Sequence, residues 1–125
     1  MLFDTDVIIW FQRGNMKAAE IVDRDEERAI SAQTYMELFQ GARNTRHQRL
    51  IKDFLGALQF ATLPITPNIS HRAMVYVEEY ALSSGLTAAD ALVAATAIEL
   101  SLPLVSGNAR HFRMIQKLDL RVFRP

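Results

Sequence analysis

Three acidic residues, spread far apart along this 125-residue sequence, are the first candidates for chemistry. Asp4 follows a short apolar run at 1–3, and Asp90 is the only ionisable residue between positions 86 and 98. Glu37 lies in a helical segment that follows a second short apolar stretch. A carboxylate among so many apolar neighbours costs several kcal/mol unless an interaction compensates for it.

One such compensating interaction is with a metal ion. Carboxylates that a fold brings together repel one another, and a divalent cation removes that repulsion. Mg²⁺ and Mn²⁺ prefer carboxylate and water ligands, and a water molecule that the cation retains can ionise and attack phosphorus. If Asp4, Glu37 and Asp90 meet, we expect a Mg²⁺ or Mn²⁺ site that needs no side-chain nucleophile.

Each acid also has a purely structural interpretation. Thr87-Ala88-Ala89-Asp90 has the spacing of a capping box, in which Asp90 would satisfy the first turn of a helix. Asp4 would likewise cap a helix that starts directly after it. The sequence alone leaves both interpretations open.

Cysteine and histidine, the other side chains that commonly bind metals or act as nucleophiles, do not point to a different kind of active site. The chain has no cysteine, which excludes disulfides, a thiolate zinc site and a Cys nucleophile. His47 and His71 fall among polar residues of helical segments and are predicted to lie on the surface. His111 comes soon after Asn108, and for it we favour a packing or surface role over contact with a substrate.

The elements that must position these acids alternate between short apolar strands and helices. This alternation predicts a three-layer α/β domain over 1–125, with helices on both faces of a parallel sheet of about five strands. The predicted strands cover 1–3, 29–31, 60–65, 104–106 and 120–123. The predicted helices cover 7–12, 16–24, 33–43, 46–58, 68–84, 87–101 and 108–117.

Polar residues recur where strands of this sheet would end. Asp4 and Asp6 follow the first strand, and Ser106 and Asn108 follow or end the fourth. Sites in open α/β sheets gather outside the carboxyl ends of the strands, so we expect these residues at one edge. Glu37 and Asp90 lie on helices that the same fold would bring there.

The net charge and hydropathy of the whole chain limit its possible partners and its location in the cell. The formal net charge is zero, so contact with a nucleic acid would depend on local basic residues. Arg43, Arg110 and Arg113 are the candidates for phosphate contacts. No apolar run approaches the length of a membrane span, and the amino terminus does not resemble a signal peptide, so we expect a cytoplasmic protein that contacts no membrane.

Four segments together resemble the PIN-domain family, and their order and spacing are similar to those of VapC-type toxins of bacterial toxin–antitoxin pairs. The resemblance covers essentially the whole chain, and it is the combination of segments that is specific. The segments are Leu2-Phe3-Asp4-Thr5-Asp6-Val7-Ile8-Ile9, Tyr35-Met36-Glu37-Leu38-Phe39-Gln40-Gly41-Ala42, Leu86-Thr87-Ala88-Ala89-Asp90-Ala91-Leu92-Val93-Ala94-Ala95-Thr96-Ala97 and Leu104-Val105-Ser106-Gly107-Asn108-Ala109-Arg110-His111-Phe112.

The resemblance implies a Mg²⁺- or Mn²⁺-dependent endoribonuclease in which Asp4, Glu37 and Asp90 hold the metal. It implies that Asp6 contributes through a water molecule and that the hydroxyls of Thr5 and Ser106 orient the acids. Asn108 stands where many members have a further Asp, and its neutral amide lowers the negative charge of the site.

The resemblance also implies partners: a homodimer, a cognate antitoxin that blocks the site, and a larger assembly of the two. The apolar stripe Leu50, Ile51, Phe54, Leu55, Leu58 and the surface near Trp10, Phe11, Tyr35 and Phe39 would offer a groove for an antitoxin helix. The alternative for these residues is the ordinary core of the domain.

Two other functions compete with this interpretation. Asp4-Thr5-Asp6 also resembles the nucleophile motif of haloacid-dehalogenase-like phosphatases, although the closing segment lacks the acidic pair that these enzymes need. The second alternative is a PIN-like module with little activity that only binds RNA or protein.

Overall fold

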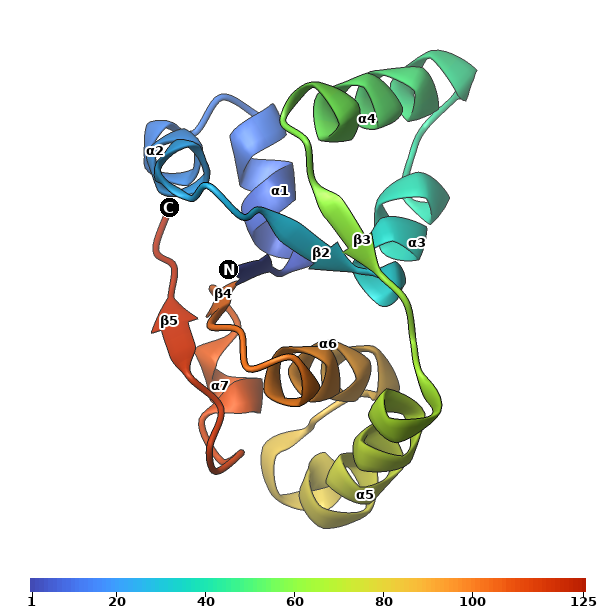
Figure 1. The fold of residues 1–125 in the computed structure, drawn as a ribbon, viewed down its shortest axis with the longest axis vertical. Coiled ribbons are helices and arrows are strands. Elements are labelled where there is room, and N and C mark those ends of the chain that lie inside the picture. Colours follow the sequence, from blue (N-terminus) through green and yellow to red (C-terminus); the bar gives the residue numbers. More distant parts are fainter.

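The computed structural model describes residues 1–125, and its centre is a five-stranded sheet in the order β3-β2-β1-β4-β5. All neighbouring strands are parallel, and helices cover both faces (Figure 1). The predicted three-layer α/β architecture is therefore confirmed. The elements are β1 (Leu2–Phe3), α1 (Thr5–Gln12), α2 (Met16–Arg24), β2 (Ala29–Ser31), α3 (Ala32–Gln40), α4 (Thr45–Ala57), β3 (Ala61–Leu63), α5 (Pro67–Ser84), α6 (Ala88–Glu99), β4 (Leu104–Ser106), α7 (Ala109–Phe112) and β5 (Leu120–Val122).

Successive residues of the neighbouring strands β1 and β4 supply the two faces of the sheet, as strand geometry requires. Leu2 and Leu104 pack with α5, α6 and α7, and we call this cluster the α6-side core. Phe3 and Val105 pack with α1, α2, α3 and α4, and we call this cluster the α1-side core. Parallel sheets are usually covered on both faces, which explains why Leu2, Phe3, Leu104 and Val105 are all apolar and buried.

Two helices begin directly at the end of a strand. The Asp4 carboxylate Oδ1 accepts the backbone N–H of Thr5 at 2.8 Å, and α1 starts there. The Ser31 hydroxyl accepts the N–H of Thr34 at 3.0 Å, and α3 starts at Ala32. Because these caps lie within or beside the strands, both helices begin earlier than the predicted 7–12 and 33–43.

The last helix is shorter than predicted. The expected span was 108–117, but α7 covers only Ala109–Phe112. Turns follow it, and Lys117 has a left-handed backbone with φ of 67°. Phe112 and Ile115 are both buried, so their spacing is compatible with a continuous helix although the chain turns between them.

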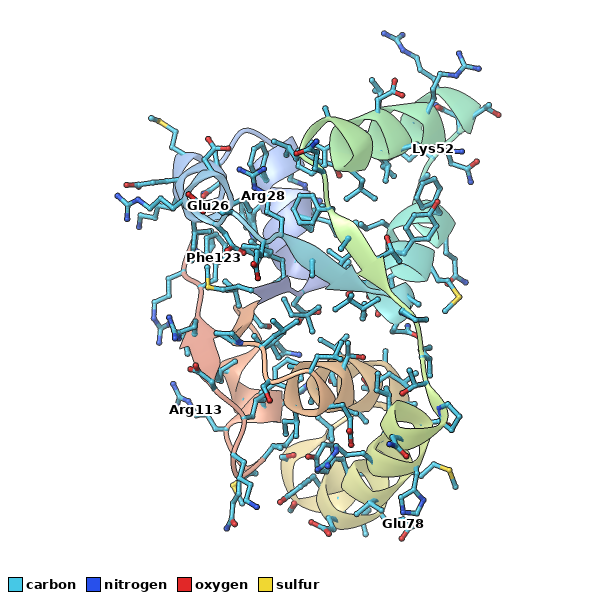
Figure 2. All side chains as sticks on the ribbon, viewed as in Figure 1. Glu26, Arg28, Lys52, Glu78, Arg113 and Phe123 are labelled. Atoms are coloured by element: carbon cyan, nitrogen blue, oxygen red, sulfur yellow. The ribbon has the colours of Figure 1, made fainter.

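Arg28 ties two helix ends to the start of β2 (Figure 2). Its guanidinium donates to the carbonyls of Val22 and Asp23 at the end of α2, at 2.8 and 3.3 Å, and to that of Leu58 after α4, at 2.9 Å. A cation is favourable at helix carboxyl ends, where carbonyls lack partners.

Most of the apolar stripe on α4 belongs to the core rather than to an open groove. Ile51 and Leu55 are buried, and Phe54 and Leu58 pack against the α1-side core. Leu50 is the exception, with 55% of its surface exposed, and Lys52 on the same helix is exposed as well. No helix is both long and apolar enough to cross a bilayer.

We expect Arg28→Gln to lower the free energy of unfolding by about 2 kcal/mol, because the carbonyls of two helix ends lose charged donors. Urea unfolding monitored by circular dichroism measures this change. Arg24→Gln is the matched control, since Arg24 is exposed and pairs only with Glu20, and it should change stability by less than about 0.5 kcal/mol. Equal losses in the two variants would contradict the role of Arg28.

Candidate active site

The parallel pairing of β1 with β4 brings the ends of these two strands together. The backbone N–H of Asp4 donates to the carbonyl of Val105 at 2.9 Å, and the buried Ser106 hydroxyl donates to Asp4 Oδ2 at 2.7 Å. With Oδ1 accepting from Thr5, both oxygens of this carboxylate have a fixed direction. Only 9% of the Asp4 surface is exposed.

The environment of Asp4 strongly disfavours its negative charge. The pKa of the Asp4 carboxyl is raised from 3.8 to about 7, mainly by burial and to a lesser extent by the nearby carboxylates of Asp6 and Asp90. The hydrogen bonds from Ser106 and Thr5 oppose this shift but are too weak to cancel it. A positive ion beside Asp4 would therefore relieve a large electrostatic penalty.

Asp6 presents an unpaired oxygen. Its Oδ2 accepts the backbone N–H of Gly107 at 2.8 Å, whereas its Oδ1 is buried without any hydrogen-bond partner. Burial also raises the pKa of this carboxyl. Glycine at position 107 lets this contact form, because a Cβ there would lie 2.6 Å from Asp6 Oδ2 and displace the carboxylate. Buried polar atoms nearly always have partners, so an orphaned carboxylate oxygen fits a cation or a water molecule beside it.

Asp90 caps a helix, as its spacing from Thr87 predicts, and also lines the acidic end of the sheet. It completes the capping box of α6, accepting the N–H of Thr87 at 3.3 Å. The same oxygen, Oδ2, lies 2.8 Å from Nδ1 of His111, and this ring nitrogen lies 3.0 Å from the amide nitrogen of Asn108. The ring of His111 thus bridges two residues of the site, a contact that the sequence did not predict.

Glu37 stands farther from the other acids. Its side chain is partly exposed, and Oε1 accepts from Gln33 at 3.1 Å. Glu37 nevertheless lines the same pocket of about 470 Å³, which we call the acid pocket. The lining residues are Asp4, Thr5, Asp6, Ile9, Glu37, Asp90, Gly107 and Asn108.

The acid pocket has the donor chemistry of a hard-cation site but not a closed cage. Its ligand atoms are oxygens, as Mg²⁺ and Mn²⁺ prefer. No three of its acidic side chains converge into a complete set of metal ligands. The arrangement therefore fits a cation that is held by few protein oxygens and keeps several water molecules.

The remaining predicted residues divide into two groups. Ser106 contacts Asp4, whereas the Thr5 hydroxyl lies 3.3 Å from that of Thr34 and connects α1 with α3. None of the three arginines lines the acid pocket. Arg110 and Arg113 are exposed, with Arg113 projecting outward (Figure 2), and Arg43 lines a neighbouring cavity.

Comparison with known proteins assigns the chain to a family. Residues 1–118 match the PIN domain. The chain belongs to the PIN-domain family. This match confirms the prediction from the four sequence segments and argues against the haloacid-dehalogenase alternative.

Relatives of this PIN domain match it over almost its entire length. Ribonuclease VapC19 of Mycobacterium tuberculosis is 31% identical over 123 residues, covering 94% of this chain and 96% of VapC19. In a toxin–antitoxin complex from Klebsiella pneumoniae, a chain matches with a TM-score of 0.81 and 27% identity, covering 97% and 95% of the two chains. FitAcB from Neisseria gonorrhoeae contains a chain with a TM-score of 0.73 and 27% identity, covering 98% and 96%.

We expect Asp4→Asn to stabilise the metal-free PIN domain at alkaline pH. Because the pKa of Asp4 is raised in the folded state, that state binds more protons than the unfolded chain between about pH 4 and pH 7, and stability falls as pH rises through this range. Asparagine can still cap α1 without a charge to bury. Its unfolding free energy in EDTA should exceed that of the wild type by a few kcal/mol at about pH 8 and match it near pH 4.

Chemical denaturation across this pH range measures the difference, and Asp53→Asn, an exposed change on α4, is the control. A constant gap between Asp4→Asn and the wild type at every pH would show that the Asp4 carboxylate is not under electrostatic strain.

Proposed function

We propose that this PIN domain is a divalent-metal-dependent endoribonuclease and the toxin of a type II toxin–antitoxin pair. The observation that carries the proposal is the acid pocket, where Asp4 is buried among other carboxylates and Asp6 has a buried oxygen without a partner. The likeness to Ribonuclease VapC19 supports RNA as the substrate.

The proposed metal ligands are Asp4, Glu37 and Asp90, with Asp6 contributing through a water molecule. The chemistry that Mg²⁺ or Mn²⁺ supplies when bound is to acidify a water molecule and to offset charge on the phosphate oxygens. Ser106 holds Oδ2 of Asp4, and Gly107 holds Oδ2 of Asp6, so these carboxylates keep their direction without a metal. Such preorganisation avoids rearrangement during the reaction.

Other residues would act around this centre. The Asn108 side chain lies beside the ring of His111, next to Asp90, and is a neutral hydrogen-bonding group for the substrate. Thr5 lines the pocket and fixes α1 against α3. Arg110 and Arg113 are exposed beyond the end of β4 and would position RNA through its phosphates.

We expect Asp90→Asn to reduce RNA cleavage by at least about 100-fold, since even outer-shell changes at metal sites cost up to that much. Asparagine keeps an oxygen for the capping box, so the fold should remain. The assay follows cleavage of total RNA and a fluorescent RNA in Mg²⁺, in Mn²⁺ and in EDTA.

Asp53→Asn, which removes one exposed carboxylate, should cleave like the wild type. If Asp90→Asn is equally active, Asp90 is only a helix cap and the proposed site is wrong. If the wild type binds RNA but never cleaves it in either metal, the protein is the inactive binding module considered above.

A cognate antitoxin and a homodimer complete the proposed function, and the likeness to a chain of a toxin–antitoxin complex supports the first. We expect a short neighbouring reading frame whose product has a DNA-binding amino-terminal half. Co-purification and loss of RNA cleavage on adding that product test this expectation. A neighbouring product that neither binds nor inhibits would contradict it, and light scattering measures the oligomeric state.

A further inference from the structure

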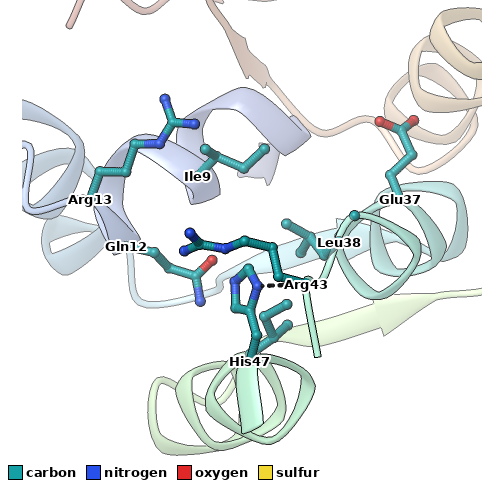
Figure 3. Close-up of a pocket in the computed structure, with 9 residues that line it drawn as sticks. Ile9, Gln12, Arg13, Glu37, Leu38, Arg43 and His47 are labelled. Atoms are coloured by element: carbon teal, nitrogen blue, oxygen red, sulfur yellow. Dashed lines mark hydrogen bonds between the residues drawn. The ribbon is translucent and has the colours of Figure 1, made fainter. Parts of the chain in front are cut away.

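A second cavity, of about 500 Å³, adjoins the acid pocket (Figure 3). It lies among α1, α3 and α4, and we call it the basic cavity. Ile9 and Glu37 line both the basic cavity and the acid pocket, so the two form neighbouring depressions of one surface. A ligand longer than one phosphate group would therefore reach from one into the other.

The charge of the basic cavity is positive. Arg13 and Arg43 both line it, and neither forms an ion pair within the chain. Glu37 is the only acid in its lining, and its carboxylate is turned away from Arg43 and His47 (Figure 3). The Arg13 guanidinium lies 5.8 Å from the centre of the Trp10 ring, a contact that restricts its movement. The guanidinium groups of Arg13 and Arg43 point in different directions (Figure 3), but both residues line this cavity without an ion-pair partner, and this favours an anion.

The hydrogen bonding of His47 adds a donor to this cavity. The backbone N–H of Arg43 donates to Nδ1 of His47 at 3.0 Å (Figure 3). Because Nδ1 accepts this bond, the proton of the neutral ring is on Nε2. His47 and Gln12 therefore bring N–H donors to the lining that the two arginines already share.

We propose that the basic cavity binds a backbone phosphate of the RNA, close along the strand to the phosphate that is cleaved in the acid pocket. The inference rests on the proposed function. Guanidinium groups match phosphate through paired N–H donors, and a ligand with phosphates at regular intervals occupies both depressions at once. An acidic segment of a protein partner would bind only in the basic cavity, because the carboxylates of the acid pocket would repel its negative charge.

The first test measures binding of a short fluorescent single-stranded RNA in EDTA, at several salt concentrations. Arg13→Gln and Arg43→Gln should each weaken binding about tenfold, as expected for loss of a charged hydrogen bond. Each should also reduce the slope of log affinity against log salt by about 0.7. Arg49→Gln is the matched control, because Arg49 is exposed on α4 outside the cavity lining, and it should change neither quantity.

The second test locates the phosphate. In a set of 2′-O-methyl RNAs, one linkage at a time carries an uncharged methylphosphonate. One position should weaken binding to the wild type but not to Arg43→Gln, because the variant has already lost that contact. A linkage profile that is identical in the two proteins would overturn the inference.

Three further outcomes bear on the inference. If both arginine variants bind RNA normally but bind the antitoxin less tightly, the cavity belongs to a protein partner and the inference is wrong. In Mg²⁺, the variants should raise KM with little change in kcat, as expected for lost uniform binding. A wild type that binds RNA without cleaving it would refute the proposed function, whereas the binding experiments would still decide the phosphate site.

Discussion

The burial of one carboxylate, that of Asp4, organises the site. Asp4 lies at the end of the central strand, where Thr5 and Ser106 each donate a hydrogen bond to its carboxylate. The carboxylates of Asp6 and Asp90 lie nearby. The fold tolerates this arrangement because the strand, the helix cap and the neighbouring strand all fix the same residue. Without a cation, the buried negative charge of Asp4 destabilises the folded protein, and a bound cation would remove this penalty.

The sheet explains why residues so distant in sequence meet. Parallel pairing of β1 with β4 brings Asp4 against Ser106 and aligns Asp6 with Gly107. The alanines of α6 let this helix lie close to the sheet, so that Asp90 in its first turn reaches the same edge. The chemistry of the pocket thus depends on strand register and on small side chains as much as on the acids themselves.

The order and type of the elements could be predicted from the sequence, because the spacing of apolar residues within each short segment already distinguishes a strand from a helix. Sequence reasoning overextended α7, since the burial of Phe112 and Ile115 is compatible with either a helix or a turn. It also identified the acids of the pocket, because a carboxylate in an apolar helix such as α6 is conspicuous. It did not predict the contact of His111 with Asp90, and it missed Gly107 and Arg13, because these contacts exist only between neighbours that the fold brings near.

The two hydrophobic cores have a consequence for how this protein varies. Asp90 adjoins Ala91 of the α6-side core, whereas Glu37 adjoins Leu38 of the α1-side core, and Asp4 lies between them. The spacing between opposite walls of the pocket is therefore set by packing on two independent sides of the sheet. A substitution buried in either core would therefore change the distance between the acidic side chains. The pocket would then be altered although all of its acidic residues are retained.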